Sequence, residues 1–265
     1  MSSTNRCLLV EYRERVCTLT INRPETKNAL SLELADAMTR TLGELSRRPD
    51  PPVMIVRGAG DAAFCSGFDI RSLPAGAPSA AGLERIGPVE TLFQHVVDYP
   101  MPVIAMINGA AFGAGCELAV CCDLRIAADH ACMGMPPARL GLVYPWTGLR
   151  RFVHAIGLAR SKEMFFTART YRGAELKRIG LVNEVLPRHE LQAVTTRLAD
   201  EIAVHAPLAL KGIKRVLNLL QQSAALQPEA EREAQARVAE ALASEDLQEG
   251  RQAFIEKRPP RFKGA

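Results

Sequence analysis

The stretch Val103–Ala127, VIAMINGAAFGAGCELAVCCDLRIA, carries the pattern that decides the fold class. Its first five residues, Val103–Ile107, are apolar and partly β-branched, which is typical of a buried strand. Asn108–Gly115 is a turn built from small residues, and the apolar run Cys116–Cys122 behind it predicts a buried helix. A strand, a tight turn and a helix in direct succession indicate an α/β fold.

Segments on either side of this stretch repeat the alternation. Val16–Ile21 and Val53–Val56 predict further strands, and a second small-residue turn, Ala63–Ile70 (AFCSGFDI), follows the latter. Ser31 is a candidate N-cap for a helix whose apolar positions recur at helical spacing. These positions are Leu34, Ala35, Met38, Leu42 and Leu45.

The last third of the chain contains helical patterns only. Apolar residues recur at helical spacing from Leu191 to Ile202, and Pro207 ends or restarts that helix. Leu208–Leu220 and Glu229–Ser244 also read as helices, and no strand follows them. We therefore predict a core domain over residues 1–205 and a helical region over residues 206–265.

Composition excludes several classes of protein. The chain has 265 residues, of which 48% are hydrophobic, enough for a sizeable core, and none of its apolar runs is long enough to span a membrane. The N-terminus lacks a signal-peptide pattern, which favours a cytoplasmic location. The odd count of seven cysteines with no C-x-x-C pair predicts free thiols, and the scattered histidines predict no metal site.

The charge distribution says more than the net charge. A formal charge of +4 is too mild to indicate a nucleic-acid partner. The last fifteen residues alone carry five basic side chains against Glu256, a net of 5 − 1 = +4. This tail is either a solvated basic end or a surface that meets phosphates.

The segment Pro74–Pro88 (PAGAPSAAGLERIGP) is rich in small residues. It has two interpretations: a flexible insertion, or a mobile lid beside a functional site. The flanking turns favour the lid.

The turn that runs from Gly113 into the apolar helix is a candidate binding site for a carbonyl group. A helix start presents unpaired N–H donors, and small residues let a carbonyl group approach that backbone closely. Ordinary packing is the alternative, whereas a phosphate loop or a dinucleotide fingerprint does not fit the glycine spacing. Glu117 is unusual inside this apolar helix. It is either half of a buried ion pair or a carboxyl with a raised pKa that is suited to acid–base work.

Several of these segments together resemble the crotonase superfamily, also called the enoyl-CoA hydratase/isomerase family. The resemblance runs in order from about residue 8 to the C-terminus. The matching segments are Asn22–Glu25 with Asn28–Leu30, Ala63–Ile70, Ile107–Ala127, Gly180–Asn183 and Asp246–Lys263.

The resemblance implies a fold and a partner. Members of this family fold as a spiral of ββα turns followed by C-terminal helices that trimerise, and two trimers often stack into a hexamer. We therefore expect a homotrimer or homohexamer that binds a coenzyme A thioester. No separate cofactor is implied, because the coenzyme A is part of the substrate, and neither nucleic acid nor a membrane is expected.

The resemblance also implies site residues. The thioester oxygen is expected between the N–H groups of Phe68 and Ala114, and the glycine of many relatives at the latter position is not required because only the N–H acts. One such donor typically contributes about 3 kcal/mol to stabilising an enolate oxyanion. The residues that match coenzyme A-binding elements are Lys27, Ala29, Leu30, Ser66, Asp69 and Arg71, with Phe262 and Lys263 from the tail, often of a neighbouring subunit.

The departures from the family pattern concern the acid–base groups. Glu117 matches the first of the two glutamates of standard hydratases, but Pro137 occupies the second position and cannot move a proton. A simple isomerase is in doubt for the same reason, and Pro145 stands where dehalogenating relatives carry a nucleophilic aspartate. The segment Met133–Trp146 is most similar to alkylmalonyl-CoA decarboxylases, which share a tyrosine matching Tyr144. The bacterial methylmalonyl-CoA decarboxylase differs in having histidine at the position of Phe68.

Three functions follow from these observations. The first is a lyase that forms an enolate, with Tyr144 orienting a leaving carboxylate and Glu117 serving the protonation step; Tyr144 as an ordinary loop residue is the alternative. The second is a hydratase or dehydratase of a specialised enoyl-CoA that uses Glu117 alone. The third is a non-catalytic acyl-CoA-binding protein.

Overall fold

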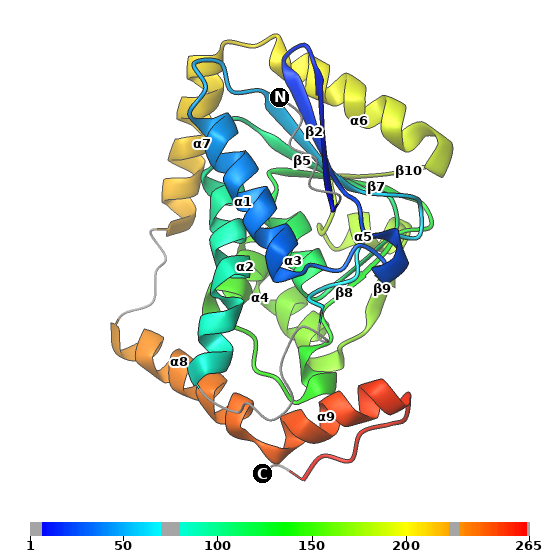
Figure 1. Ribbon diagram of the computed structural model, residues 1–265, viewed down its shortest axis with the longest axis vertical. Coiled ribbons are helices and arrows are strands. Elements are labelled where there is room, and N and C mark those ends of the chain that lie inside the picture. The colour runs from blue at the N-terminus through cyan, green and yellow to red at the C-terminus, as the bar shows by residue number, and fades with distance from the viewer. Residues whose placement is uncertain (1–6, 70–79, 223–227, 264–265) are drawn as a thin grey trace.

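Two β-sheets form the centre of the computed structural model, which describes residues 7–69, 80–222 and 228–263 (Figure 1). In the six-stranded sheet, only the first strand runs antiparallel to its neighbour. Its strands are, in spatial order, β1 (Leu8–Arg13), β2 (Val16–Ile21), β3 (Val53–Gly58), β5 (Val103–Ile107), β7 (Leu124–Ala128) and β10 (Glu184–Leu186). The four-stranded sheet contains β4 (Ala63–Cys65), β6 (Ala110–Phe112), β8 (Cys132–Gly134) and β9 (Thr170–Arg172).

The chain advances as a spiral of repeated ββα turns, as the sequence predicted. Three times in succession a strand enters the larger sheet, the next strand enters the smaller sheet, and a helix follows. The turns are β3–β4–α2, β5–β6–α3 and β7–β8–α4. Because successive strands of one sheet run parallel, each turn needs a crossover connection, and the helix supplies it.

The helices of the spiral lie against these sheets and against one another. Ser31 caps the first helix by accepting a hydrogen bond from Leu34 N at 3.2 Å, as predicted. The α6 helix packs on β2, β3, β5 and β7 of the larger sheet (Figure 1). The helices are α1 (Leu32–Ser46), α2 (Ala80–Asp98), α3 (Ala114–Cys121), α4 (Trp146–Thr167), α5 (Ala174–Arg178) and α6 (Arg188–Ala203), with short 3₁₀ turns η1 (Pro24–Thr26) and η3 (Pro137–Leu140).

The C-terminal region is helical, as the sequence predicted. It contains α7 (Pro207–Gln222), α8 (Pro228–Ala243) and α9 (Glu245–Glu256). The sequence patterns predicted the last helix over Glu229–Ser244 and did not predict α9. Ser244 begins α9 by accepting a hydrogen bond from Leu247 N at 3.1 Å. The predicted division between residues 205 and 206 falls in the connection between α6 and α7. Among the described residues, no helix is long and apolar enough to cross a membrane.

The segment Pro74–Pro88 requires a correction. Residues 74–79 lie outside the described part of the chain, whereas residues 80–88 begin α2, so this part is not a flexible insertion, and its role as a mobile lid stays a prediction. Further along α2, apolar positions at helical spacing are buried and hold the helix on the core. They are Val89, Leu92, Phe93 and Val96. The small residues at the start of the helix hid this pattern.

Candidate functional site

The two small-residue turns lie side by side because the strands before them are neighbours. β4 and β6 pair in parallel in the smaller sheet, so their carboxyl ends meet at one edge. The start of α3 is packed against the end of β4: a Cβ on Gly115 would lie 2.1 Å from the carbonyl oxygen of Cys65. Only glycine permits this approach.

The turn after β4 depends on Gly67. Its φ of +111° is in a region that L side chains rarely adopt. A Cβ at this position would lie 2.9 Å from Phe112 O and 3.9 Å from Ala114 N, so the two turns are in close contact. Within the described residues, neither Phe68 N nor Ala114 N donates a hydrogen bond to a protein acceptor. The structure therefore brings the two turns that carry these amides into contact, with the Ala114 amide at the start of a helix, and their binding of a substrate oxygen stays a prediction.

The two segments assigned to coenzyme A pair along their backbones. Leu30 N donates to Gly67 O at 2.8 Å, and Asp69 N donates to Leu30 O at 2.9 Å. Ser66 N also donates to Lys27 O at 3.1 Å. The two segments that the resemblance assigns to coenzyme A are thus joined through their backbones, and Ala29 and Leu30 within them are buried.

Arg23 holds these two segments together, a role that the sequence analysis did not assign. Its guanidinium donates to Ala29 O at 2.6 Å and to the Asp69 carboxylate at 3.2 Å. The N-R-P-E motif that contains Arg23 was identified, but an arginine in a motif does not reveal its acceptors. Asp69 is therefore paired with a cation, and its contribution to coenzyme A binding remains a prediction.

Two asparagine side chains tie the neighbouring loops to the strands. Asn28 donates to Ala59 O at 3.0 Å and to Ala63 O at 2.7 Å. Asn108 accepts from Gly58 N at 3.0 Å and donates to Gly60 O at 2.6 Å. Both side chains are buried, so they satisfy backbone groups that water does not reach. This explains the asparagines next to both turns of the motif.

Glu117 lies in the first turn of α3 and is 2% exposed. The Tyr144 hydroxyl donates to one carboxylate oxygen, and Arg151 Nη1 donates to the other at 2.7 Å. Burial raises the pKa of the Glu117 carboxyl, while the Arg151 charge and the Tyr144 hydrogen bond oppose that rise. Burial next to this carboxylate also raises the pKa of the Tyr144 hydroxyl well above its ordinary value. Both sequence interpretations of Glu117, ion pair and perturbed carboxyl, describe part of this geometry.

Gly148 makes the contact between Glu117 and Tyr144 possible. A Cβ at this position of α4 would lie 2.5 Å from a ring carbon of Tyr144 and 2.8 Å from Glu117 Oε1. Any larger residue would therefore displace one of the two partners. The sequence analysis gave no role to Gly148, since nothing in the spacing connects it with Glu117.

Arg151 and Glu90 are further members of the cluster that the sequence analysis missed. Glu90, on α2, accepts from Arg151 Nη2 at 2.7 Å and from Nη1 at 3.0 Å. A buried carboxylate signals that a cation must be near, because an unpaired buried charge is costly. The chain has 33 basic residues, and the sequence does not indicate which of them is the partner.

Pro137 begins the 3₁₀ turn η3 and is buried. The loop that contains it is braced by α9: a Cβ on Gly141 would meet Asp246 at 2.7 Å, and one on Gly250 would meet Leu140 at 2.7 Å. The turn at Pro137, where the resemblance implies the second glutamate of hydratases, is therefore fixed by packing.

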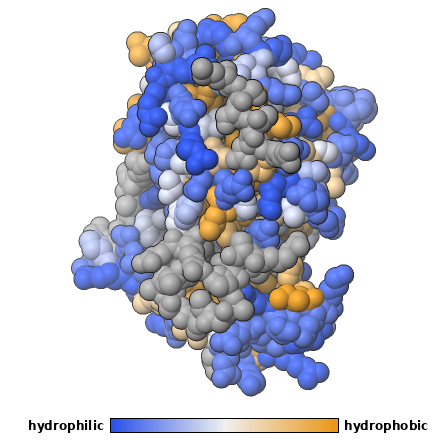
Figure 2. All heavy atoms as spheres, in the orientation of Figure 1, coloured by the Kyte–Doolittle hydropathy of each residue, from blue (hydrophilic) through white to orange (hydrophobic). Residues whose placement is uncertain are grey.

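The tail that follows α9 folds back against the start of that helix. Lys263 N donates to Asp246 Oδ1 at 2.6 Å, and Lys263 Nζ lies 3.7 Å from Glu245 Oε2. Phe262 is 42% exposed, and Figure 2 shows that the α9 end of the molecule is mostly hydrophilic. Arg71 lies outside the described residues. Binding of coenzyme A by Arg71, Phe262 and Lys263 stays a prediction. No group of three or more metal-ligating side chains occurs in the described part of the chain.

Comparisons with known proteins agree with this geometry. Residues 11–265 match the model of the family described as Enoyl-CoA hydratase/isomerase. The crotonyl-CoA hydratase of Syntrophomonas wolfei is 34% identical, over 96% of this chain and 97% of that protein. A methylmalonyl-CoA decarboxylase complexed with 2S-carboxypropyl CoA superimposes with a TM-score of 0.92 at 30% identity, over 100% of both chains. The enoyl-CoA hydratase of Bacillus anthracis gives 0.78 at 32% identity, over 98% of this chain and 100% of that one.

Proposed function

Because the chain belongs to the enoyl-CoA hydratase/isomerase family of crotonase-fold acyl-CoA enzymes, we propose that it is a lyase that decarboxylates an alkylmalonyl-CoA through an enolate. The amides of Phe68 and Ala114 hold the thioester oxygen in this proposal. Backbone donors fixed by Gly67 and the α3 terminus need no rearrangement as negative charge develops, which is the condition for favouring the enolate over the neutral thioester.

The observation that carries the proposal is the small number of ionisable groups available for proton transfer. Pro137, buried in η3, has no ionisable group, and both oxygens of Glu117 already accept hydrogen bonds from Tyr144 and Arg151. Hydration of a double bond needs groups that activate water and supply a proton. Decarboxylation removes no proton, so it is compatible with this reduced set.

The proposed reaction has two steps. First, the bond between the α-carbon and the carboxylate breaks, its electron pair moves into the enolate whose oxygen is held by the two amides, and CO₂ leaves. Second, the enolate carbon takes one proton, which originates from solvent, and becomes the α-CH₂ of the product. Tyr144, whose O–H donates to Glu117 in the free protein, turns that O–H to the leaving carboxylate once substrate is bound and orients it, and Glu117 serves the protonation step.

The backbone likeness to a decarboxylase supports the proposal. At nearly equal sequence identity, 30% against 32%, the methylmalonyl-CoA decarboxylase superimposes with a TM-score of 0.92 and the Bacillus anthracis hydratase with 0.78. Main-chain geometry therefore separates two relatives that identity does not.

Product analysis tests the proposal. The unmodified protein is incubated with methylmalonyl-CoA, ethylmalonyl-CoA and a panel of enoyl-CoA thioesters, and CO₂ and acyl-CoA products are measured. We expect CO₂ release from an alkylmalonyl-CoA, and Tyr144→Phe should reduce this turnover more than any turnover of an enoyl-CoA. Turnover of enoyl-CoA thioesters alone, or binding of every thioester without turnover, would contradict the proposal.

A hydratase of a specialised enoyl-CoA is the second candidate. It is favoured by the 34% identity to the crotonyl-CoA hydratase of Syntrophomonas wolfei, which extends over nearly the whole of both chains. In this alternative Glu117 alone handles the proton transfers. Consumption of enoyl absorbance without gas release distinguishes it from the decarboxylase.

Assembly into a homotrimer or homohexamer is part of the proposal. The α7 helix exposes several large apolar side chains by more than half of their surface, a pattern that indicates an interaction face. They are Leu208, Ile213, Val216, Leu217 and Leu220. Light scattering at micromolar concentration should give a multiple of three chains, and a monomer would refute the assembly.

A further inference from the structure

The ion pair between Glu117 and Arg151 joins two elements at the least exposed point of the cluster. The Glu117 side chain is 3% exposed and the Arg151 side chain is 12% exposed. Their contact of 2.7 Å is therefore largely removed from water, where a charge pair is screened less than at the surface.

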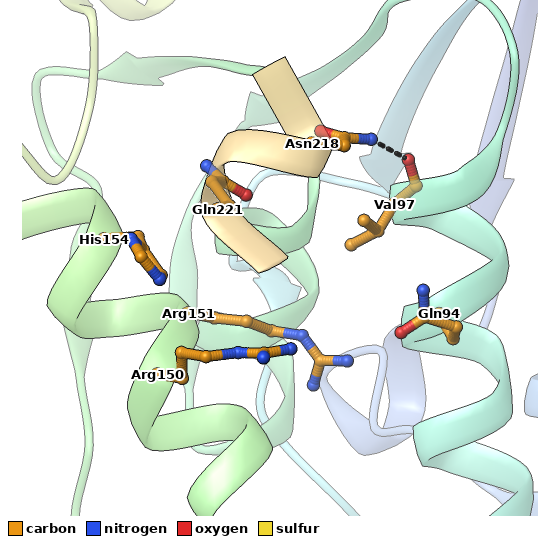
Figure 3. A pocket seen from close by; sticks show the side chains of 7 residues that line it. All are labelled: Gln94, Val97, Arg150, Arg151, His154, Asn218 and Gln221. Carbon is orange, nitrogen blue, oxygen red and sulfur yellow. Dashed lines mark hydrogen bonds between the residues drawn. The ribbon is translucent and has the colours of Figure 1, made fainter. Parts of the chain in front are cut away.

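Arg151 is itself fixed from a second side. Glu90 of α2 holds both terminal nitrogens of its guanidinium, and the guanidinium carbon lies 5.7 Å from the centre of the Phe93 ring. Figure 3 shows the side chain reaching from α4 toward α2, beside a cavity of about 40 Å³ that Arg150, His154 and residues of α7 also line. The planar guanidinium can serve two carboxylates at once, which the ammonium of a lysine does less well.

The groups that face Glu117 have opposite effects on its pKa. Arg151 and Tyr144 come from α4 and the loop before it, Glu90 acts from α2 through Arg151, and Cys116 and Cys121 belong to α3 itself. Burial and the Glu90 charge raise the pKa of Glu117, whereas Arg151 and the Tyr144 hydrogen bond lower it. Burial is the largest of these effects, so the pKa of Glu117 is raised even with Arg151 in place, and without Arg151 it would be raised further.

The protonation of Glu117 sets the direction of its hydrogen bond with Tyr144. An ionised carboxylate only accepts, so the Tyr144 proton points at Glu117. A neutral Glu117 would donate its own proton to the Tyr144 oxygen and turn the Tyr144 O–H elsewhere. Arg151 therefore affects the orientation of the Tyr144 O–H indirectly, through the ionisation of the Glu117 carboxyl.

We propose that Arg151 is a positioning residue that keeps Glu117 ionised and thereby fixes where the Tyr144 proton is held before the enolate forms. This inference rests on the proposed use of Glu117 and Tyr144, but the ionisation of Glu117 is measurable without any substrate. Arg151 acts through Glu117 and makes no contact with the reacting atoms in this account.

The first experiment measures ionisation in the free enzyme by infrared spectroscopy as a function of pH. Wild type and Arg150→Met should show no carbonyl band of protonated Glu117 at neutral pH, whereas Arg151→Met should show one that disappears in the double variant with Glu117→Gln. Arg150 is a matched control because it is the neighbouring arginine of α4 and its guanidinium lies over the Trp146 ring, at 4.9 Å, instead of pairing with Glu117. A protonated Glu117 in wild type, or an ionised one in Arg151→Met, overturns the inference. The wild-type titration decides the matter even where Arg151→Met does not fold.

The second experiment measures turnover of the substrate found by product analysis. Arg151→Met should lower kcat by about 10²-fold, since the phenol is no longer aimed correctly, with little change in KM. The limb of the pH–rate profile that belongs to Glu117 should move to higher pH. Arg151→Lys keeps the charge, so it should restore part of kcat and return the limb toward its wild-type position, and Arg150→Met should leave both unchanged. Equal losses in Arg151→Met and Arg151→Lys with an unmoved limb would mean a structural role and refute the inference.

Discussion

The turns that carry the Phe68 and Ala114 amides differ in construction from the Glu117–Tyr144–Arg151 cluster beside them. The turns present backbone groups, and their geometry is set by glycines and by the buried amides of Asn28 and Asn108. The cluster presents side chains from α3, the η3–α4 loop and α4. Alanine can replace glycine at position 114 without loss of the N–H, but proline at position 137 removes an acid–base group completely. Under the proposed function, the comparison teaches that enolate stabilisation belongs to the framework and that reaction choice belongs to a few exchangeable side chains.

Glu117→Gln should separate the two regions most strongly. Loss of one acid–base group typically lowers the rate by about 10²–10⁴-fold, and we expect a loss of that size in kcat. Coenzyme A affinity should be unchanged, because the amide hole and the segment Lys27–Leu30 are built from backbone. Steady-state kinetics and calorimetry with coenzyme A measure the two effects. A parallel loss of affinity would show that the regions are not independent.

Gly148→Ala should sharpen the comparison by disturbing only the side-chain region. The new methyl group would overlap Tyr144 and Glu117, so we expect a loss in kcat of about 10²-fold and destabilisation by about 1–3 kcal/mol. Gly43→Ala is a matched control in α1, where a Cβ meets only the Arg47 side chain at 3.8 Å or more. It should keep full activity and gain about 0.5–1 kcal/mol of stability. Kinetics and thermal unfolding of both variants decide the matter, and equal activities would contradict the packing argument.

The backbone region was predictable from sequence for a physical reason. Its glycines, asparagines and flanking strands occupy fixed positions because the main chain leaves few alternatives. The motifs around Gly67 and Gly113 therefore indicate the fold, and the two amides are predicted from them through the resemblance. The strands Val16–Ile21 and Val103–Ile107 agree with the structure at both ends for the same reason.

The side-chain region was only partly predictable. Glu117 was identified from its place in an apolar helix and Tyr144 through the resemblance. Arg151, Glu90 and Gly148 reach them from other elements, and no local spacing records such contacts. The helix at residues 80–88 was missed because glycine and proline in this segment are typical of loops, whereas the buried apolar positions lie further along α2.

The smallest expected effects concern the charged groups assigned to phosphate. Lys263→Ala and Arg71→Ala should each weaken coenzyme A binding a few-fold, about 2–5-fold, because exposed charge pairs contribute little. The losses should shrink as salt rises. Arg197→Ala, which removes an exposed charge on α6, is the control and should not change affinity. Calorimetry at two salt concentrations measures this, and unchanged affinity in both test variants would remove these residues from the binding surface.

The most direct measurement of the one-carboxylate account is crotonyl-CoA hydration by the unmodified protein, followed by loss of enoyl absorbance. Since Pro137 replaces the second acid–base group and Glu117 is held by Tyr144 and Arg151, the account predicts weak or absent hydration. Pro137→Glu should raise it where the η3 loop accepts the longer side chain. Rapid hydration by the unmodified protein, at the rate of a hydratase with two glutamates, would contradict the account and identify an ordinary hydratase.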